Sequence, residues 1–464
     1  MSACKPLAAF AAVASVVFAP AILAEDDAAA LRAELQSLKS EYDARVAALE
    51  ARISQLEATA AATASAAEMV PAEAAPAPAA AAGPSAFNPA ISLILAGNYA
   101  DTSREPGDWR MAGFIPSGDE VGPGERSFNL GESELVMTAS VDPYFTASLI
   151  AAITAENEIE VEEALFRTTA LPAGFTVKGG RFFSGFGYLN EVHAHAWDFV
   201  DQPLVYQAFF GGQRSEDGLQ LKWLAPVDLF LELGAEAGNG EAFPGTRQGG
   251  NGLNGITLFA HLGGDLGDNA SWRAGGSWLD LDAENRIYED TASAGNPVVN
   301  AFTGSSETWV ADAVLKWAPG GNSALRYLEL QGEYMRRRES GILDFDVENA
   351  ALGDAYRSTQ TGWYVQGVYQ FRPRWRAGLR YDSLDSGDTD IGLVASGVLT
   401  PADFPALLAG DPTRTTLMLD WSPSEFSRWR LQYAWDEARD DGDTDRQLQL
   451  QYLLGIGAHG AHKY

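Results

Sequence analysis

The sequence predicts an all-β protein: a 16-stranded antiparallel transmembrane β-barrel preceded by an N-terminal α-helical coiled coil. Three observations support this fold class. From Phe87 onward the chain divides into sixteen segments in which apolar and polar residues alternate. Tight and long connections alternate between these segments. Beyond the first 24 residues, no stretch approaches the roughly 20 consecutive apolar residues of a spanning helix.

The first 24 residues have the features of a secretory signal peptide. Lys5 precedes an apolar run that ends at Ala24, and acidic residues follow at once. We therefore expect a mature chain that begins near Glu25, with an uncleaved membrane anchor as the alternative. The only cysteine, Cys4, lies in this segment, so the mature chain can form neither a disulfide nor a thiolate metal site.

Residues 25–59 are expected to form a coiled coil in the periplasm. Apolar residues recur at intervals of three or four positions, and charged residues fill the positions between them. A single amphipathic helix lying on the body of the protein is the alternative. Residues 60–86 are rich in Ala and Pro and have little to bury, which indicates an extended linker. The barrel is expected to occupy residues 87–464.

The sixteen strand segments are expected at about 90–100, 129–141, 144–155, 160–170, 175–183, 216–224, 229–238, 255–266, 270–282, 307–317, 325–336, 359–371, 375–383, 413–421, 427–436 and 446–457. Tight turns follow every second segment, and most of the other connections are long. This arrangement is typical of barrels in the bacterial outer membrane, where an even number of strands places both chain ends on the periplasmic side.

The residue types on the two faces of each segment predict whether that face contacts lipid or water. In WVADAVLKW, Trp309 and Trp317 bracket an apolar face while Asp312 lies on the other face. Aromatic residues at both ends of an apolar face are typical of a strand that crosses a bilayer. A soluble β-sandwich would instead need far fewer strands and an inward face rich in branched aliphatics.

The last segment, QLQLQYLLGI, shows the same alternation. Its leucines are expected to face lipid and its glutamines to face water inside the barrel. Tyr464 shares the parity of the leucines. Because outer-membrane strands commonly end on an aromatic residue, Tyr464 resembles the signal that the barrel assembly machinery reads.

The connection 185–214 differs from an ordinary external loop. It is rich in aromatic and aliphatic residues, so we expect it to fold into the barrel and pack against the inner wall. A loop in that place would constrict the pore, where charge sets selectivity. The residues expected at this constriction are Glu191, His193, His195, Asp198 and Asp201.

His193 and His195 also raise the possibility of a metal site. Spaced two residues apart on an extended chain they point the same way, and nearby carboxylates could complete a nitrogen and oxygen site for zinc. Histidines that merely pack or hydrogen-bond within the constriction are the alternative. Zinc is the only cofactor that the sequence suggests. His459 and His462 lie on opposite parities and favour a role in strand closure.

Basic residues with inward parity are expected to line the pore. They are Lys178, Lys222, Arg376, Arg380, Arg428 and Arg430, and acidic residues such as Glu132 and Glu134 are interleaved with them. The arginines concentrate on segments 375–383 and 427–436, which predicts one wall more positive than the rest and a field that orients passing solutes. Charges that merely keep the channel wet are the alternative.

Composition excludes several classes of function. The net charge of −31 argues against nucleic acid as a partner, because phosphate contacts need clustered Lys and Arg. Motifs such as GxSxG, HExxH and CxxC are absent from the sequence, and no phosphate-cradling glycine loop is present. We therefore do not expect an enzyme.

KGGRFFSGFGYLNE at 178–191, together with the sixteen-segment layout behind a coiled coil and linker, resembles a family of porins. That family includes the phosphate-selective porins O and P and the dicarboxylate porins with a periplasmic coiled coil. The resemblance implies a homotrimer in outer-membrane lipid, a constricting loop after the GRFFSGFG strand, and passive diffusion of small hydrophilic solutes or ions. Phosphate-selective members have a basic ladder through the pore, and the excess of acid here departs from that pattern.

A weaker resemblance links the histidine-bearing loop and the GAHGAHKY ending to zinc-related outer-membrane receptors, although the chain is too short for a TonB-dependent barrel with a plug. The sequence thus predicts an outer-membrane porin. The alternatives are a metal uptake receptor and an envelope tether, in which the coiled coil would be the functional domain.

Overall fold

The computed structural model describes residues 89–117, 121–154, 158–246 and 252–457, and their strands form one antiparallel sheet that closes on itself. The predicted signal peptide (1–24), coiled coil (25–59) and linker (60–86) lie outside the described residues, as do His459, His462 and Tyr464. Among the described residues, no helix combines the length and apolar character needed to cross a membrane.

The strands are β1 Ala90–Thr102, β2 Ser127–Leu130, β3 Ser133–Ser140, β4 Phe145–Ile153, β5 Ile159–Thr168, β6 Phe175–Phe183, β7 Ser215–Leu224, β8 Phe230–Gly238, β9 Gly255–Asp265, β10 Ala270–Thr291, β11 Pro297–Trp317, β12 Tyr327–Phe345, β13 Leu352–Arg372, β14 Trp375–Ile391, β15 Thr413–Ser424, β16 Ser427–Asp436 and β17 Asp445–Gly457. The α-helices are α2 Leu204–Phe210 and α3 Gly392–Ala395. The 3₁₀ turns are η1 Pro106–Asp108, η2 Pro172–Gly174, η3 Ala194–Ala196, η4 Pro319–Gly321, η5 Pro401–Asp403 and η6 Pro405–Leu407.

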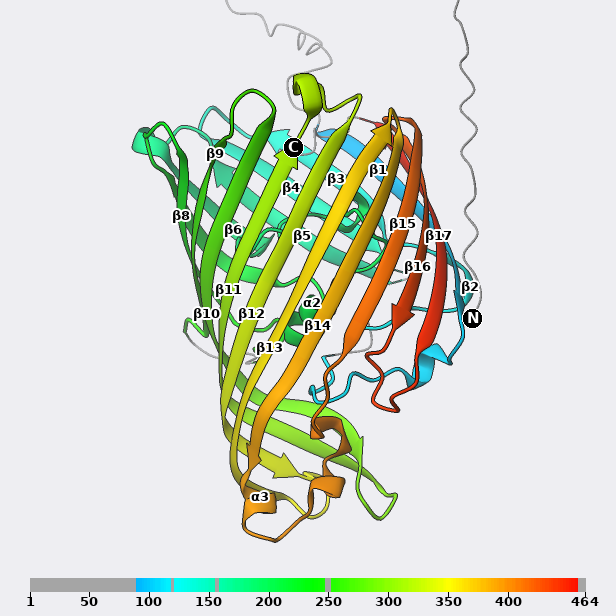
Figure 1. Ribbon diagram of the computed structural model, residues 1–464. Coiled ribbons are helices and arrows are strands. Elements are labelled where there is room, and N and C mark those ends of the chain that lie inside the picture. The colour runs from blue at the N-terminus through cyan, green and yellow to red at the C-terminus, as the bar shows by residue number, and fades with distance from the viewer. Residues whose placement is uncertain (1–88, 118–120, 155–157, 247–251, 458–464) are drawn as a thin grey trace, which may run out of the picture. The chain divides into compact units, whose positions relative to one another are not determined.

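The seventeen strands make sixteen spans of the barrel wall. Strands β2 and β3 both pair with β1 and are two parts of one span, separated by Gly131 and Glu132. Strand β17 pairs with β1 from Ser92 opposite Gly457 to Thr102 opposite Gln447, which closes the sheet and leaves no free edge. The prediction of a closed 16-stranded antiparallel barrel is confirmed (Figure 1).

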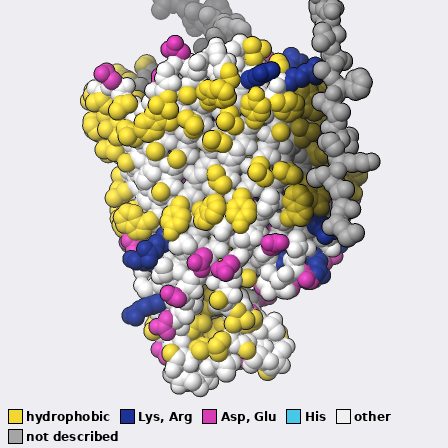
Figure 2. Space-filling model, in the orientation of Figure 1, with side chains coloured by type: hydrophobic (Ala, Val, Ile, Leu, Met, Phe, Trp, Pro, Cys, Tyr) yellow, Lys and Arg dark blue, Asp and Glu magenta, His cyan; other side chains and the backbone are white. Residues whose placement is uncertain are grey.

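Side chains alternate between an apolar outer face and a largely polar inner face. In β17, Leu450 is 38% exposed, whereas Gln447, Gln449 and Gln451 are 2–8% exposed because they point into the barrel. In β11, Trp309 is 53% exposed while Asp312 is buried. Figure 2 shows the hydrophobic side chains gathered in a broad belt over the strands. A belt of this kind suits contact with lipid, so the strands are membrane-spanning.

The connections also alternate as the sequence predicts. The turns after β3, β5, β7, β9, β11, β13 and β15 lie at the end of the barrel where β1 begins and β17 finishes. The longest connections, at 103–126, 184–214 and 392–412, lie at the other end. This asymmetry is that of an outer-membrane barrel.

Strands β10 to β14 are longer than predicted, at 17 to 22 residues each. They continue past the barrel into a lobe that carries α3, visible at the bottom of Figure 1. Their outward positions turn acidic there, as at Asp280 and Asp282, so the apolar alternation that marks a lipid-facing strand stops. The inner faces there, together with residues of the connections 103–126 and 392–412, form a second apolar core: Ile115, Ala283, Tyr288, Val298, Phe302, Leu343, Phe345, Tyr356, Leu393, Phe404 and Leu407.

Candidate functional site

Residues 185–214, which make up all but the first residue of the connection between β6 and β7, lie inside the barrel, and we call them the inward segment. All residues of its helix α2 except Gln207 are aliphatic or aromatic, and all seven are at most 5% exposed. A helix with that composition must be buried all round. It packs against inward-facing residues of five consecutive strands: Leu279, Val310, Met335, Tyr364 and Leu384.

A carboxylate on β12 fixes the position of α2. Glu333 is 2% exposed and accepts hydrogen bonds from the Tyr206 hydroxyl at 3.0 and 3.1 Å and from the Tyr364 hydroxyl at 2.8 Å. It also accepts one from the backbone N–H of Leu189 at 3.0 Å. Because a buried carboxylate is costly without such donors, these contacts define one orientation of the inward segment.

The two ends of the inward segment are tied together at its base. The Asn190 side chain donates to the carbonyls of Ser184 and Arg214 at 2.8 and 2.9 Å and accepts from the Arg214 backbone N–H at 2.9 Å. Glu236 on β8 accepts from the Gly185 N–H at 2.7 Å and from the Ser184 hydroxyl. The sequence did not point to Asn190 or Glu236, because every partner of Asn190 and one partner of Glu236 are backbone groups, which a pattern of residue types does not reveal.

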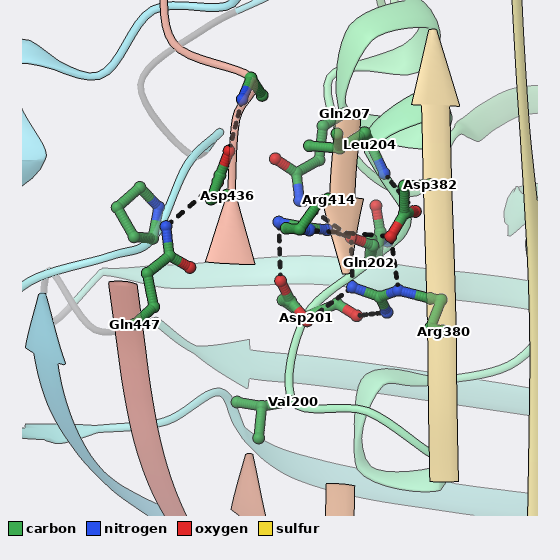
Figure 3. Close-up of polar contacts among 12 residues, drawn as sticks. Val200, Asp201, Gln202, Leu204, Gln207, Arg380, Asp382, Arg414, Asp436 and Gln447 are labelled. Atoms are coloured by element: carbon green, nitrogen blue, oxygen red, sulfur yellow. Dashed lines mark hydrogen bonds and ion pairs between the residues drawn. The ribbon is translucent and has the colours of Figure 1, made fainter. Parts of the chain in front are cut away.

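Arginines of β14 and β15 hold the middle of the inward segment. Arg380 Nη2 lies 2.9 Å from Asp201 Oδ1, and Arg414 Nη1 lies 2.8 Å from Asp201 Oδ2 (Figure 3). Arg376 Nη1 lies 2.7 Å from Asp198 Oδ1. Burial alone would raise the pKa of Asp201, but the two arginines and a hydrogen bond from Gln432 lower it to about 2. Asp201 is therefore ionised at neutral pH.

Two arginines of β16 bind backbone carbonyls of the inward segment. Arg430 donates to the carbonyl of Phe199 at 2.8 Å and to that of Trp197. Arg428 donates to the carbonyl of His195. A guanidinium presents several donors in a fixed plane, so these contacts constrain the backbone direction as well as its position.

Two lysines bind the first predicted constriction residue, Glu191. The Nζ of Lys222 lies 3.1 Å from Glu191 Oε1, and the Nζ of Lys178 lies 3.3 Å from the same oxygen. With the arginine contacts, all six predicted pore-lining cations touch the inward segment. Their charge is therefore shared with its carboxylates and carbonyls. That they also line an aqueous path stays a prediction.

The histidines lie among carboxylates of β3 and β5. His195 Nδ1 is 2.6 Å from Glu134 Oε1, and His193 Nδ1 is 3.3 Å from Glu162 Oε2. His193 Nε2 is 3.6 Å from Glu163 Oε2. Burial alone would lower the pKa of His193, but hydrogen bonds with Glu162 and Glu163 raise it to about 10. The imidazolium form is therefore favoured at neutral pH.

The carboxylates near the histidines are not those suggested from the sequence. Glu191, Asp198 and Asp201 were candidate partners, and each instead pairs with lysine or arginine elsewhere on the wall. Glu162 and Glu163 were missed because a β-bulge lies there: Ile150 opposes Glu163 while Ala151 opposes Val161, which leaves Glu162 as an extra residue. Glu162 and Glu163 can then both reach His193, whereas in a regular strand their side chains would point to opposite faces.

No protein-family model matches the chain. An uncharacterized protein from Aquifex aeolicus (strain VF5) is 32% identical over 408 residues, which cover 82% of this chain and 80% of the relative.

Among solved structures, the outer membrane channel DcaP of Acinetobacter baumannii is similar with a TM-score of 0.49 and 12% identity, over 81% of this chain and 99% of that one. OprB of Pseudomonas putida gives a TM-score of 0.48 and 15% identity over 80% and 94%. OmpT of Vibrio cholerae gives 0.47 and 11% over 83% and 100%.

Proposed function

The chain belongs to the same family as the uncharacterized Aquifex aeolicus protein, and we propose that it is an outer-membrane porin. It gives small hydrophilic solutes or ions a passive route across the membrane, through a barrel that the inward segment narrows. The proposal places the barrel in outer-membrane lipid and the N-terminal region in the periplasm.

The observation that carries this proposal is the two-faced wall of a closed 16-span barrel. Apolar residues such as Leu450 and Trp309 face outward, while Gln447, Gln449 and Gln451 face inward. A water-filled route for solutes requires a polar inner face of this kind.

The contacts of the inward segment support its role as the selective part of that route. Its ion pairs join it to β3 and β5 through Glu134 and Glu162, and to β14 and β15 through Arg380 and Arg414. A segment fixed across a lumen leaves solutes a narrower path whose charge is set by side chains, which is the physical basis of selectivity in pores.

The homotrimer and the recognition of Tyr464 by the barrel assembly machinery rest on the resemblance to porins. Chemical cross-linking of the full chain in outer-membrane vesicles tests the homotrimer, and a band at three times the monomer mass is the expected result.

Deletion of Tyr464 tests its recognition by the assembly machinery. We expect the folded fraction of the protein to fall.

Single-channel recording in a planar bilayer tests the proposed function. We expect the purified full chain to give discrete conductance steps, and reversal potentials in a salt gradient then measure its ion preference. The matched control is the same preparation unfolded by heat before addition. A folded protein that inserts into the bilayer and produces no steps would contradict the proposal.

A further inference from the structure

We propose that Glu134, Glu162 and His193 bind a divalent transition-metal ion of the zinc class inside the barrel, between the wall strands β3 and β5 and the inward segment. The proposal does not depend on solute diffusion, because the three side chains meet whether or not the barrel conducts.

The distances between the three ligand atoms suit one ion. His193 Nδ1 lies 3.3 Å from Glu162 Oε2 and 3.7 Å from Glu134 Oε2, and all three atoms lie within 4.8 Å of one another. Bonds of about 2.0–2.2 Å in a tetrahedral arrangement separate neighbouring ligand atoms by about 3.4 Å. One ion can therefore reach all three atoms with small side-chain adjustments.

The second observation is an unsatisfied oxygen aimed at this point. Glu134 is fully buried, and its Oε2 has no hydrogen-bond partner among the described residues. A buried carboxylate oxygen without a donor is costly. A bound cation at the centre of the three ligands satisfies that oxygen and takes the place of the ring proton at His193 Nδ1.

The surrounding residues form the outer shell that a metal-binding histidine normally has. A ligating histidine usually donates its other ring nitrogen to a carboxylate. Here Glu163 Oε2 lies 3.6 Å from His193 Nε2, on the far side of the ring. His195 Nδ1 lies 2.6 Å from Glu134 Oε1 and so orients that carboxylate. The β-bulge at Glu162 is what allows both Glu162 and Glu163 to serve the same imidazole.

The donor set selects the class of ion. One imidazole nitrogen with two carboxylate oxygens suits zinc and its neighbours in the first transition series. Calcium and magnesium prefer sites made wholly of oxygen. Since His193 comes from the inward segment and the glutamates come from the wall, a bound ion joins the two and holds that end of the segment in place.

Zinc titration of the full chain in detergent tests the site. The protein is stripped with a chelator, and Zn²⁺ is then titrated in competition with a chromophoric chelator of known affinity. We expect His193→Ala and Glu162→Gln to bind one of the wild type's zinc equivalents at least tenfold more weakly. The matched control is His261→Ala, which removes a buried histidine that also pairs with a glutamate, Glu232, on another part of the wall.

The shift in gel mobility on heating reports whether each variant is folded. If His193→Ala does not fold, the zinc affinity of Glu162→Gln alone tests the site. Equal zinc affinity and stoichiometry in the wild type and both folded ligand variants would overturn the proposal, as would a wild type that binds no zinc. X-ray absorption should show one imidazole among oxygen ligands. A first shell with two or more imidazoles would also overturn it, because that shell would place the ion at other histidines.

Discussion

The inward segment meets the barrel wall in two places that differ in charge balance. At the arginine anchor, formed by Asp198 and Asp201 with Arg376, Arg380 and Arg414, positive and negative groups meet in pairs. At the histidine anchor, the carboxylates Glu134, Glu162 and Glu163 lie against His193 and His195, and the carboxyl group of Glu132 lies beside Glu162. Four carboxyl groups there face two imidazoles.

The difference concerns the carboxylate oxygens of the two anchors. Both oxygens of Asp201 have an arginine partner, so the protein itself supplies the positive charge that this carboxylate needs. At the histidine anchor, Glu134 Oε2 lacks a hydrogen-bond partner among the described residues. We expect changes at the arginine anchor to alter stability under all conditions, and changes at the histidine anchor to alter it most when a metal ion is supplied.

The largest effect is expected at the arginine anchor. Arg380→Met leaves a buried carboxylate with one partner fewer, and we expect the free energy of unfolding to fall by about 3–5 kcal/mol. Urea unfolding in detergent micelles, followed by tryptophan fluorescence, measures it. The control is Arg181→Met, because the pair of Arg181 with Asp217 is about 40% exposed and should contribute less than about 1 kcal/mol. Equal losses in both variants would erase the distinction between this anchor and a surface ion pair.

The next largest effect is expected at the histidine anchor when zinc is supplied. Zinc at about 100 times its dissociation constant should raise the free energy of unfolding by about 2.7 kcal/mol, since it binds only the folded chain. His193→Ala should not be stabilised by zinc. Arg380→Met should be stabilised by zinc as much as the wild type, although its free energy of unfolding without zinc is lower. The same urea titration with and without zinc measures both. A gain that persists in His193→Ala would show that the zinc acts elsewhere.

A smaller effect concerns pH. The pKa of Asp201 is about 2 in the folded protein against an ordinary value of 3.8, so its ion pairs contribute stability above pH 3.8 that is lost as pH falls through 2. The contribution is roughly 2 kcal/mol. We expect the stability difference between wild type and Asp201→Asn to shrink from pH 4 to pH 2. A difference that stays constant over this range would contradict the assigned pairing.

The smallest effect concerns selectivity near the base of the inward segment. Glu191→Gln removes a carboxylate shared by Lys178 and Lys222, which leaves that region more positive. We expect the reversal potential in a salt gradient to move toward the value for anions. The corresponding change in the free energy that sets relative permeability should be less than about 1 kcal/mol. Asp228→Asn, exposed in the turn between β7 and β8, is the control that should leave the potential unchanged. An equal shift in both variants would mean that Glu191 has no special place along the path.

The barrel could be predicted from the sequence because its two faces meet different solvents. Lipid outside and polar groups inside impose a period of two on each strand, as Gln449 and Leu450 illustrate. The ends of β10 to β14 could not be predicted in this way. Beyond the membrane both faces meet water or a local core, and Asp280 and Asp282 then interrupt the apolar alternation.

The candidate site was predictable only in part. The apolar character of 204–210 indicated a segment packed inside the barrel, and the spacing of His193 and His195 indicated a common direction. Their partners were not predictable, because Glu162 and Glu134 lie 31 and 61 residues away in sequence. The pattern of residue types does not indicate the bulge at Glu162, so the cluster of four carboxyl groups could not be predicted from the sequence.

Cysteine labelling during single-channel recording is the most direct way to learn whether the inward segment borders the route of solutes. The predicted mature chain has no cysteine, so Ala196→Cys in the inward segment and Ala311→Cys on the lipid-facing side of β11 give clean single sites. We predict that a water-soluble, charged thiol reagent lowers the conductance of the Ala196→Cys channel and leaves the Ala311→Cys channel unchanged. Full conductance after complete labelling at position 196 would show that the inward segment does not border that route.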